Sequence, residues 1–158
     1  MQSITTQETK HGKGVFALRP FSKGEVILQA KGPILDDDDF EDGSYEDCHC
    51  LQIGERTYIG SSGEIDDFVN HSCDPNAGYR VVGQQADLIA IRDIQVGEEI
   101  TFDYSTSMHN DANEMDCQCG TSQCRKRIRD FQYLPKELKA RYIDLGIVPD
   151  FIVKMKCE

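Results

Sequence analysis

The 158-residue sequence lacks the features that mark membrane, secreted and nucleic-acid-binding proteins. No apolar run approaches the length of a membrane span, and residues 1–6 lack the charged and apolar regions of a signal peptide. Basic residues are few: 17 Lys and Arg stand against 28 Asp and Glu, for a net charge of -11. Non-specific nucleic-acid binding needs positive charge, so no direct nucleic-acid partner is expected. We therefore expect an intracellular protein, cytoplasmic or nuclear, that binds no membrane and takes a cationic partner.

Long helical patterns are also missing before residue 125. Short strand-like runs take their place, at residues 15–18, 25–30, 45–59 (two strands around a turn at 54–55), 80–82, 87–91 and 96–104. Near the end, Pro135 opens a predicted helix that carries Leu138, Tyr142 and Leu145 on one face, and Gly146 ends it. The length fits one domain, and the pattern predicts a mainly β fold with a C-terminal helix.

Three segments allow a plain structural interpretation beside a functional one. The acidic run at residues 36–39 is predicted to be a solvated loop, with docking of a basic peptide as the alternative. The Cys-His-Cys triplet at 48–50 alternates across a predicted strand, which favours ordinary core thiols over a metal site. Gly12 and Gly14 precede a strand and indicate either a tight turn or a loop that approaches a ligand. The Pro-Gly break at residues 20–24 excludes the helix that a dinucleotide-binding fold would place there.

The densest polar stretch is residues 70–76, Asn-His-Ser-Cys-Asp-Pro-Asn, which directly follows an apolar pair. Buried polar groups need partners, so this run is costly near a core unless it forms a site. Cys73 can be a nucleophile with His71 as its base, although residues two apart on a strand rarely meet in the required geometry. Cys73 can instead be one metal ligand, or the whole stretch can be a buried, hydrogen-bonded turn.

A second cluster, Cys117, Cys119 and Cys124, places three of the seven cysteines in one short loop. An odd total and such tight spacing are typical of metal ligands and free thiols rather than of a disulfide framework. Three thiolates in one loop indicate zinc, but a structural zinc site is normally closed by four ligands. The local spacing therefore leaves one ligand to be found elsewhere in the chain.

Four motifs stand in a fixed order along the chain: the glycine loop at 12–14, the polar stretch at 70–76, Gly-Glu-Glu-Ile-Thr-Phe-Asp-Tyr at 97–104, and Cys-x-Cys-x4-Cys at 117–124. Together they resemble the SET-domain protein lysine methyltransferases that carry a post-SET zinc segment, over residues 10 to 128. The resemblance implies the SET-domain fold, with short sheets and a knot-like C-terminal crossing. It divides the chain into a SET domain (1–110), a post-SET zinc-binding segment (111–128) and a C-terminal helical extension (129–158).

The resemblance also supplies the missing metal ligand. In such proteins the cysteine of the Asn-His-Ser-Cys motif joins the three post-SET thiols, which implies one structural zinc ion held by Cys73, Cys117, Cys119 and Cys124. Four thiolates complete a tetrahedron, and the metal would hold the C-terminal segment against the active site.

The family cofactor is S-adenosylmethionine, and the catalytic tyrosine of the family matches Tyr104. The resemblance places the cofactor against six residues: Lys13, Gly14, Phe16, Asn70, His71 and Tyr104. Asp67 stands where many members carry Arg before the Asn-His pair, which changes the charge expected near the cofactor.

The lysine channel departs from the common family pattern. Where many members have Glu-Tyr-x-Gly, this chain has Gln-Ala-Lys-Gly at 29–32, so a channel tyrosine is missing. Tyr45 is our candidate for the missing, second catalytic tyrosine, and Tyr58 is the alternative. Phe102 and Tyr79 are the other expected channel residues; phenylalanine at the first position is typical of members that add two or three methyl groups, and tyrosine at the second can restrict the product.

The resemblance implies transfer of methyl groups from S-adenosylmethionine to a lysine amine of a basic protein, a histone or another. The amine must be neutral, whereas free lysine has a pKa of about 10.4. A narrow apolar channel lowers that pKa by disfavouring the charged form, so no carboxylate base is required. The alternative is a non-catalytic SET-like module that binds a basic peptide, and the alanine at position 30 is its best support.

Overall fold

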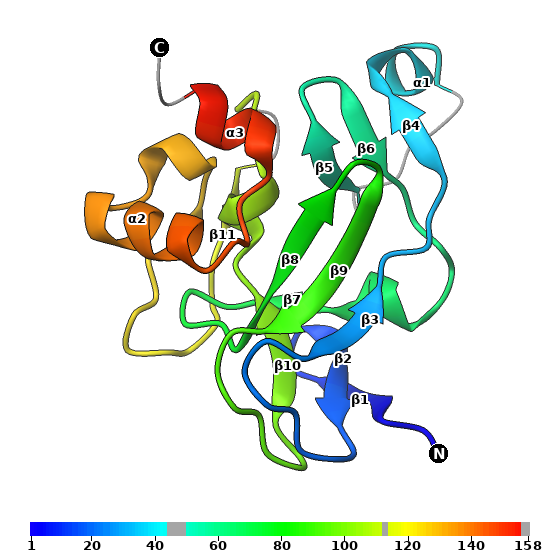
Figure 1. Ribbon diagram of the computed structural model, residues 1–158, viewed down its shortest axis with the longest axis vertical. Coiled ribbons are helices and arrows are strands. Elements are labelled where there is room, and N and C mark those ends of the chain that lie inside the picture. The colour runs from blue at the N-terminus through cyan, green and yellow to red at the C-terminus, as the bar shows by residue number, and fades with distance from the viewer. Residues whose placement is uncertain (44–49, 112–113, 156–158) are drawn as a thin grey trace.

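The computed structural model describes residues 1–43, 50–111 and 114–155. Tyr45 and the first two residues of the Cys-His-Cys triplet lie outside these described residues. Short strands form four small sheets. Helices α2 (Lys136–Asp144) and α3 (Asp150–Met155) lie together at the C-terminal end, and α1 (Asp37–Glu41) lies apart from them beside β4 (Ile34–Asp36) (Figure 1). No helix among the described residues is long and apolar enough to cross a membrane.

One sheet brings three of the sequence motifs together. Its strands are β1 (Ile4–Thr9), β2 (Gly12–Ala17), β10 (Glu99–Phe102) and β7 (Asn70–His71), in that order. Strand β10 runs antiparallel to β2 and parallel to β7, with Thr101 opposite Asn70 and Phe102 opposite His71. Segments that lie about thirty to ninety residues apart in the chain are therefore hydrogen-bonded neighbours, the non-sequential packing that the motifs imply.

Two three-stranded sheets and one hairpin complete the β structure. The order β3 (Val26–Gln29), β9 (Gln85–Ala90), β8 (Ala77–Val82) forms the second sheet, and the order β4 (Ile34–Asp36), β6 (Thr57–Ile59), β5 (Leu51–Gly54) forms the third. Strands β11 (Met115–Asp116) and β12 (Arg127–Ile128) frame the cysteine loop. The main core lies between the first three sheets, with fully buried side chains at Val15, Leu88 and Ile100.

The C-terminal segment packs on the β domain through a core of its own. It contains the short 3-10 helix η3 (Phe131–Tyr133), α2 (Lys136–Asp144) and α3 (Asp150–Met155). As the sequence indicates, α2 starts after Pro135 and ends before Gly146, whose φ of 72° favours glycine. Ile147 packs directly on β8, where a Cβ at Gly78 would come within 2.7 Å of its side chain. Gly78 therefore permits the close contact between segment and sheet.

Two predictions of local structure are wrong. The acidic run does not form a loop: residues 37–41 make a short helix, α1 (Asp37–Glu41), because Asp36 caps its N-terminus and three acidic residues in the first turn favour the helix dipole. Strand β10 also stops at Phe102, and Tyr104 opens a 3-10 helix, η2 (Tyr104–Ser107), capped by Asp103. Tyr104 therefore lies outside the strand, although its ring stays beside that of Phe102. The third 3-10 helix, η1 (Ile65–Phe68), precedes β7.

Candidate functional site

A cavity of about 300 Å³ lies beside the end of β10 and gathers the predicted channel residues. Tyr58, Tyr79, Phe102 and Tyr104 all line it, as does Ala30. The walls combine apolar and aromatic side chains with polar ones, among them half-buried Asp66 and Asp67 and buried Asp130. Four aromatic rings that the sequence places in three separate segments therefore share one pocket.

Part of the cavity wall is a contact between aromatic rings. Phe102 meets Tyr79 edge to face, with ring centroids 4.9 Å apart, and its centroid also lies 4.9 Å from that of Tyr104. Tyr79 is only 5% exposed, and burial raises the pKa of its hydroxyl. The negative charge of Asp66 raises this pKa further. The Tyr79 hydroxyl therefore stays protonated and adds no charge to the wall.

Tyr58 is fixed in the wall by the acidic helix. Its hydroxyl donates to Asp37 Oδ1 at 3.0 Å and accepts from Asn110 Nδ2 at 3.1 Å. Its ring packs edge to face on Phe40, 5.2 Å between centroids. Burial and the hydrogen bond to Asp37 raise the pKa of Tyr58 to about 12. The acidic run thus supports the cavity, a role that its composition does not indicate.

Tyr104 stands between this cavity and strand β7. Its hydroxyl donates to the Val69 carbonyl oxygen at 3.1 Å, and its backbone N–H donates to His71 Nδ1 at 3.0 Å. The ring lines the cavity and lies 5.2 Å from the His71 ring. The predicted catalytic residue is therefore held by both residues that flank Asn70.

Of the residues predicted to hold the cofactor, Lys13, Gly14 and Asn70 lie close together. Asn70 Nδ2 donates to the Lys13 carbonyl oxygen at 3.0 Å and to Glu99 Oε1 at 2.9 Å. A Cβ at Gly14 would lie 2.4 Å from that Glu99 oxygen and 3.1 Å from Asn70 Nδ2. Glycine therefore lets β2 approach Asn70 closely. Phe16 lies two residues further on the same face of β2, half-buried.

Asn70 and Lys13 leave polar atoms and backbone in place for a polar ligand. Both Asn70 amide hydrogens are used within the protein. Among the described residues no group donates to its Oδ1, which can accept from a ligand. Lys13 keeps its ammonium over the Phe68 ring, 5.2 Å from the centroid. A backbone edge, one amide oxygen and a half-buried ring fit the amino and adenine portions of S-adenosylmethionine.

His71 faces inward rather than toward a ligand. Its side chain is 6% exposed although the residue is half-buried, so its exposed atoms belong mainly to the backbone. Burial, opposed by Asp103 and aided by Arg125, lowers the pKa of His71 to about 4, so the ring is neutral. Because Nδ1 accepts the Tyr104 N–H, Nε2 carries the proton and donates to Cys73 Sγ at 3.3 Å. His71 and Cys73 are therefore in contact, but the ring is the donor and does not act as a base toward the thiol.

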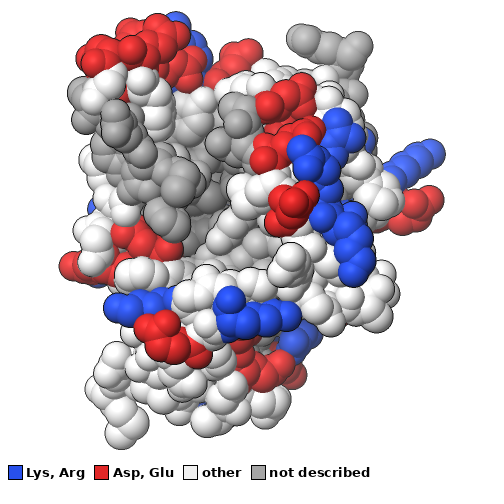
Figure 2. All heavy atoms as spheres, turned by 180° about the vertical axis from the view of Figure 1, so that it is seen from behind, with Lys and Arg blue, Asp and Glu red and all other residues white. Residues whose placement is uncertain are grey.

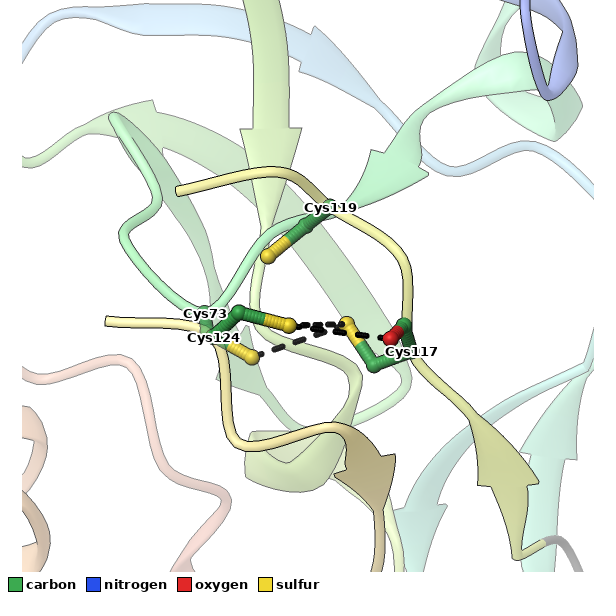
Figure 3. A group of neighbouring side chains, drawn as sticks. All are labelled: Cys73, Cys117, Cys119 and Cys124. Atoms are coloured by element: carbon green, nitrogen blue, oxygen red, sulfur yellow. Dashed lines mark hydrogen bonds between the residues drawn. The ribbon is translucent and has the colours of Figure 1, made fainter. Parts of the chain in front are cut away.

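The four predicted zinc ligands converge (Figure 3). Their sulfur atoms all lie within 4.8 Å of one another, and Cys117 Sγ is 3.7 Å from Cys73 Sγ and 3.8 Å from Cys124 Sγ. Zinc–sulfur bonds of about 2.3 Å place the corners of a tetrahedron about 3.8 Å apart. The donor set and its spacing therefore fit a structural zinc ion, and Cys73 turns toward thiols rather than toward the cavity.

One buried carboxylate beside this site was not singled out as functional from the sequence. Asp103 is 1% exposed and receives the Arg125 guanidinium at 2.8 Å and the Tyr142 hydroxyl at 2.9 Å. The sequence does place this carboxylate next to the predicted catalytic tyrosine. Its partners Arg125 and Tyr142, however, lie 22 and 39 residues away along the chain. No local pattern predicts such pairings.

The fold is mainly β, with small sheets, β7 paired to β10 and a thiol cluster beside them. Comparison with known proteins shows which family has this fold. The SET domain family model matches residues 12–105. The chain therefore belongs to the SET-domain family. It is 33% identical over 128 residues to histone-lysine N-methyltransferase 2B of Homo sapiens, covering 73% of this chain and 5% of that protein. It is also 33% identical over 145 residues to probable histone-lysine N-methyltransferase set-23 of Caenorhabditis briggsae, covering 80% of this chain and 58% of that protein.

A solved structure confirms the fold. KRYPTONITE, in a complex with mCHG DNA and SAH, superposes with a TM-score of 0.66 at 21% sequence identity, over 79% of this chain and 28% of that chain. At this identity the likeness concerns the fold alone. This chain spans less than two thirds of the length of these relatives.

Proposed function

We propose that this chain transfers methyl groups from S-adenosylmethionine to the side-chain amine of a lysine in a basic protein. The observation that carries the proposal is the place of Tyr104, which lines the aromatic cavity on one side and binds both neighbours of Asn70 on the other. A lysine entering the cavity and a cofactor on β7 would meet at this residue.

The cavity residues supply what an incoming lysine needs. Half-buried Asp66 and Asp67 attract its cationic form, and the buried rings of Tyr79 and Phe102 then disfavour the charge. Asp67 stays ionised, because hydrogen bonds from Ser61, Ser62 and Gly63 outweigh its burial and lower its pKa. The amine thus loses its proton to water, and the rings orient the alkyl stem.

Residues on the β7 side would hold the cofactor. Bound S-adenosylmethionine would supply an electrophilic methyl group carried on a sulfonium. The Asn70 Oδ1 accepts hydrogen bonds from an amino group, the exposed backbone of His71 binds a polar ring edge, and Phe16 covers an apolar one. The Tyr104 hydroxyl donates to Val69, so it acts toward a neighbouring methyl group as an acceptor.

We propose that one zinc ion closes the thiol cluster and has a structural role. It would supply a four-coordinate cross-link between Cys73, next to the site, and the loop that carries the other three thiols. The proposed division of the chain at residues 110 and 128 follows this arrangement, with residues 111–128 as the metal-binding segment and 129–158 as the extension. Residues 129–155 share a core with β9, so the extension is supported by the SET domain.

A basic protein is the proposed partner, with a histone as the first candidate because the two relatives described above are named as histone-lysine N-methyltransferases. Acidic side chains cover the corner of the molecule where α1 lies, at the upper left in Figure 2, next to the cavity wall that Tyr58 forms. The net charge of -11 supports a basic protein rather than DNA as the direct partner. We accordingly propose a nuclear, chromatin-associated location.

Binding and turnover together test the proposal. We expect calorimetry to detect S-adenosylmethionine binding, and labelled methyl to appear on lysine when core histones are supplied but not when an acidic protein is supplied. The absence of cofactor binding would overturn the proposal. Binding of a histone peptide and cofactor with no transfer to any basic protein would favour the non-catalytic module, which Ala30 supports.

A further inference from the structure

Asp103, the residue before Tyr104, is a buried carboxylate with partners from three parts of the chain. Its Oδ1 accepts from Arg125 Nη2 at 2.8 Å and from the Ser105 backbone N–H at 3.1 Å. Its Oδ2 accepts from the Tyr142 hydroxyl at 2.9 Å. Arg125 directly follows the last cysteine of the thiol cluster, and Tyr142 lies in α2 of the extension. Two segments outside the SET domain match therefore converge on one carboxylate.

The Tyr142 hydroxyl has a polar role in an otherwise apolar setting. Tyr142 is fully buried, in the same cluster as Ile89, Phe131 and Ile152. A phenylalanine would fill that cluster equally well, yet the hydroxyl ends against Asp103. Burial and the Asp103 charge raise the pKa of the hydroxyl, so it remains a donor at neutral pH. A buried carboxylate is costly without such donors.

Asp103 fixes the backbone on both sides of Tyr104. Its side chain caps η2 through the Ser105 N–H, and its carbonyl oxygen accepts from the Thr106 N–H at 3.0 Å and hydroxyl at 2.8 Å. Between these bonds the Tyr104 N–H reaches His71. The direction in which the Tyr104 ring leaves the chain is therefore set by how Asp103 is held.

We propose that Asp103 and Tyr142 are positioning residues for Tyr104, so that the C-terminal extension takes part in holding the catalytic end of β10. The kinetic part of this inference rests on the proposed function, whereas its structural part does not. The hydrogen bond from Tyr142 restricts rotation of the Asp103 carboxylate. The fixed carboxylate in turn holds the start of η2 through the Ser105 N–H. Methyl transfer is sensitive to the orientation of the groups around the reacting atoms, so a loosened Tyr104 lowers turnover rather than substrate binding.

The test compares Tyr142→Phe with Ile152→Val. The first removes one hydroxyl from Asp103; the second trims the same apolar cluster without touching Asp103. Amide hydrogen exchange at Tyr104 and Ser105, followed by NMR, needs no catalysis and reports on η2 directly. Steady-state kinetics with an unmethylated lysine peptide as the acceptor, zinc content and the dissociation constant for S-adenosylmethionine complete the comparison.

We expect Tyr142→Phe to speed exchange at Tyr104 and Ser105 by about 10-fold and to lower kcat by about 10-fold, with KM and zinc content unchanged. Ile152→Val should leave both quantities near wild type. Equal effects of the two variants on exchange, or unchanged exchange at these two amides in Tyr142→Phe, would overturn the inference. A wild-type chain that transfers no methyl group would overturn the proposed function alone, because the exchange comparison still decides the positioning.

Discussion

The rings of Tyr79 and Phe102 meet at nearly a right angle in the cavity wall, with an interplanar angle of 87° and centroids 4.9 Å apart. Tyr79 comes from β8 and Phe102 from the end of β10, so the contact joins two sheets. Of the two rings, only Tyr79 carries a hydroxyl. We propose that the space beside these rings limits how far a methylated amine can rotate.

This contact predicts the product. Phe102→Tyr adds a hydroxyl that fills space and can hold a water molecule against the amine, so we expect the products to shift toward monomethyl-lysine. Tyr79→Phe removes a hydroxyl from the same contact and should shift products toward trimethyl-lysine. Mass spectrometry of a peptide substrate at equal turnover measures both. Unchanged product ratios in both variants would show that these rings do not limit rotation.

The thiol cluster predicts one zinc ion per chain. Cys119→Ser removes one of four ligands, so bound zinc should fall and the free energy of unfolding should drop by about 3 kcal/mol or more. Cys50→Ser is the matched control, since Cys50 lines the cavity and is not among the clustered thiols. Elemental analysis and urea unfolding give the two quantities. Equal zinc content in Cys119→Ser and wild type would contradict the assignment.

Tyr58 predicts a loss of stability at high pH. Its pKa is raised to about 12 in the folded state, above the value of about 10 for an unfolded chain. The folded state therefore keeps a proton that the unfolded state loses, so this contribution is complete below about pH 10 and disappears as the pH rises to about 12. Tyrosine ring carbon shifts, assigned with Tyr58→Phe, follow the titration. Titration of Tyr58 near pH 10 would show that its hydroxyl is neither buried nor bonded to Asp37 in solution.

Gly78 predicts how tightly the extension sits on β8. Gly78→Ala places a methyl group within 2.7 Å of Ile147, and we expect it to cost about 1–3 kcal/mol of stability. Ile147→Ala should reduce that cost, because the two positions share one contact. Urea unfolding of the two single variants and the double variant measures the coupling. Strictly additive effects would mean that the extension does not pack here in solution.

The sequence predicted most of what depends on local spacing and motif order. Six predicted strand regions and the helix between Pro135 and Gly146 are present, and the resemblance to the SET-domain family is confirmed by the match over residues 12–105. The predicted zinc ligands and four aromatic residues proposed for the site are brought together as expected, although their roles stay predictions.

What the sequence did not predict depends on pairings between distant segments or on capping. Asp36 turns an acidic run into a helix, and α1 then holds Tyr58, a link that charge counting cannot reveal. Strand β10 ends at Phe102 because Asp103 caps the 3-10 helix that follows. The hydrogen bond from Tyr142 to Asp103 depends on tertiary structure, which local sequence patterns do not reveal. His71 and Cys73 meet because the chain turns sharply after β7.

The most direct test of the account is single-turnover methyl transfer by the wild type, Tyr104→Phe and Tyr133→Phe, with zinc and cofactor binding measured in each. Tyr133 is an exposed tyrosine of the extension, at 44% exposure, and serves as the control for loss of a hydroxyl. We expect Tyr104→Phe to lower the rate at least about 100-fold with zinc content and cofactor affinity unchanged, and Tyr133→Phe to match wild type. Wild-type transfer to lysine that is equally fast in Tyr104→Phe would contradict the central role given to Tyr104.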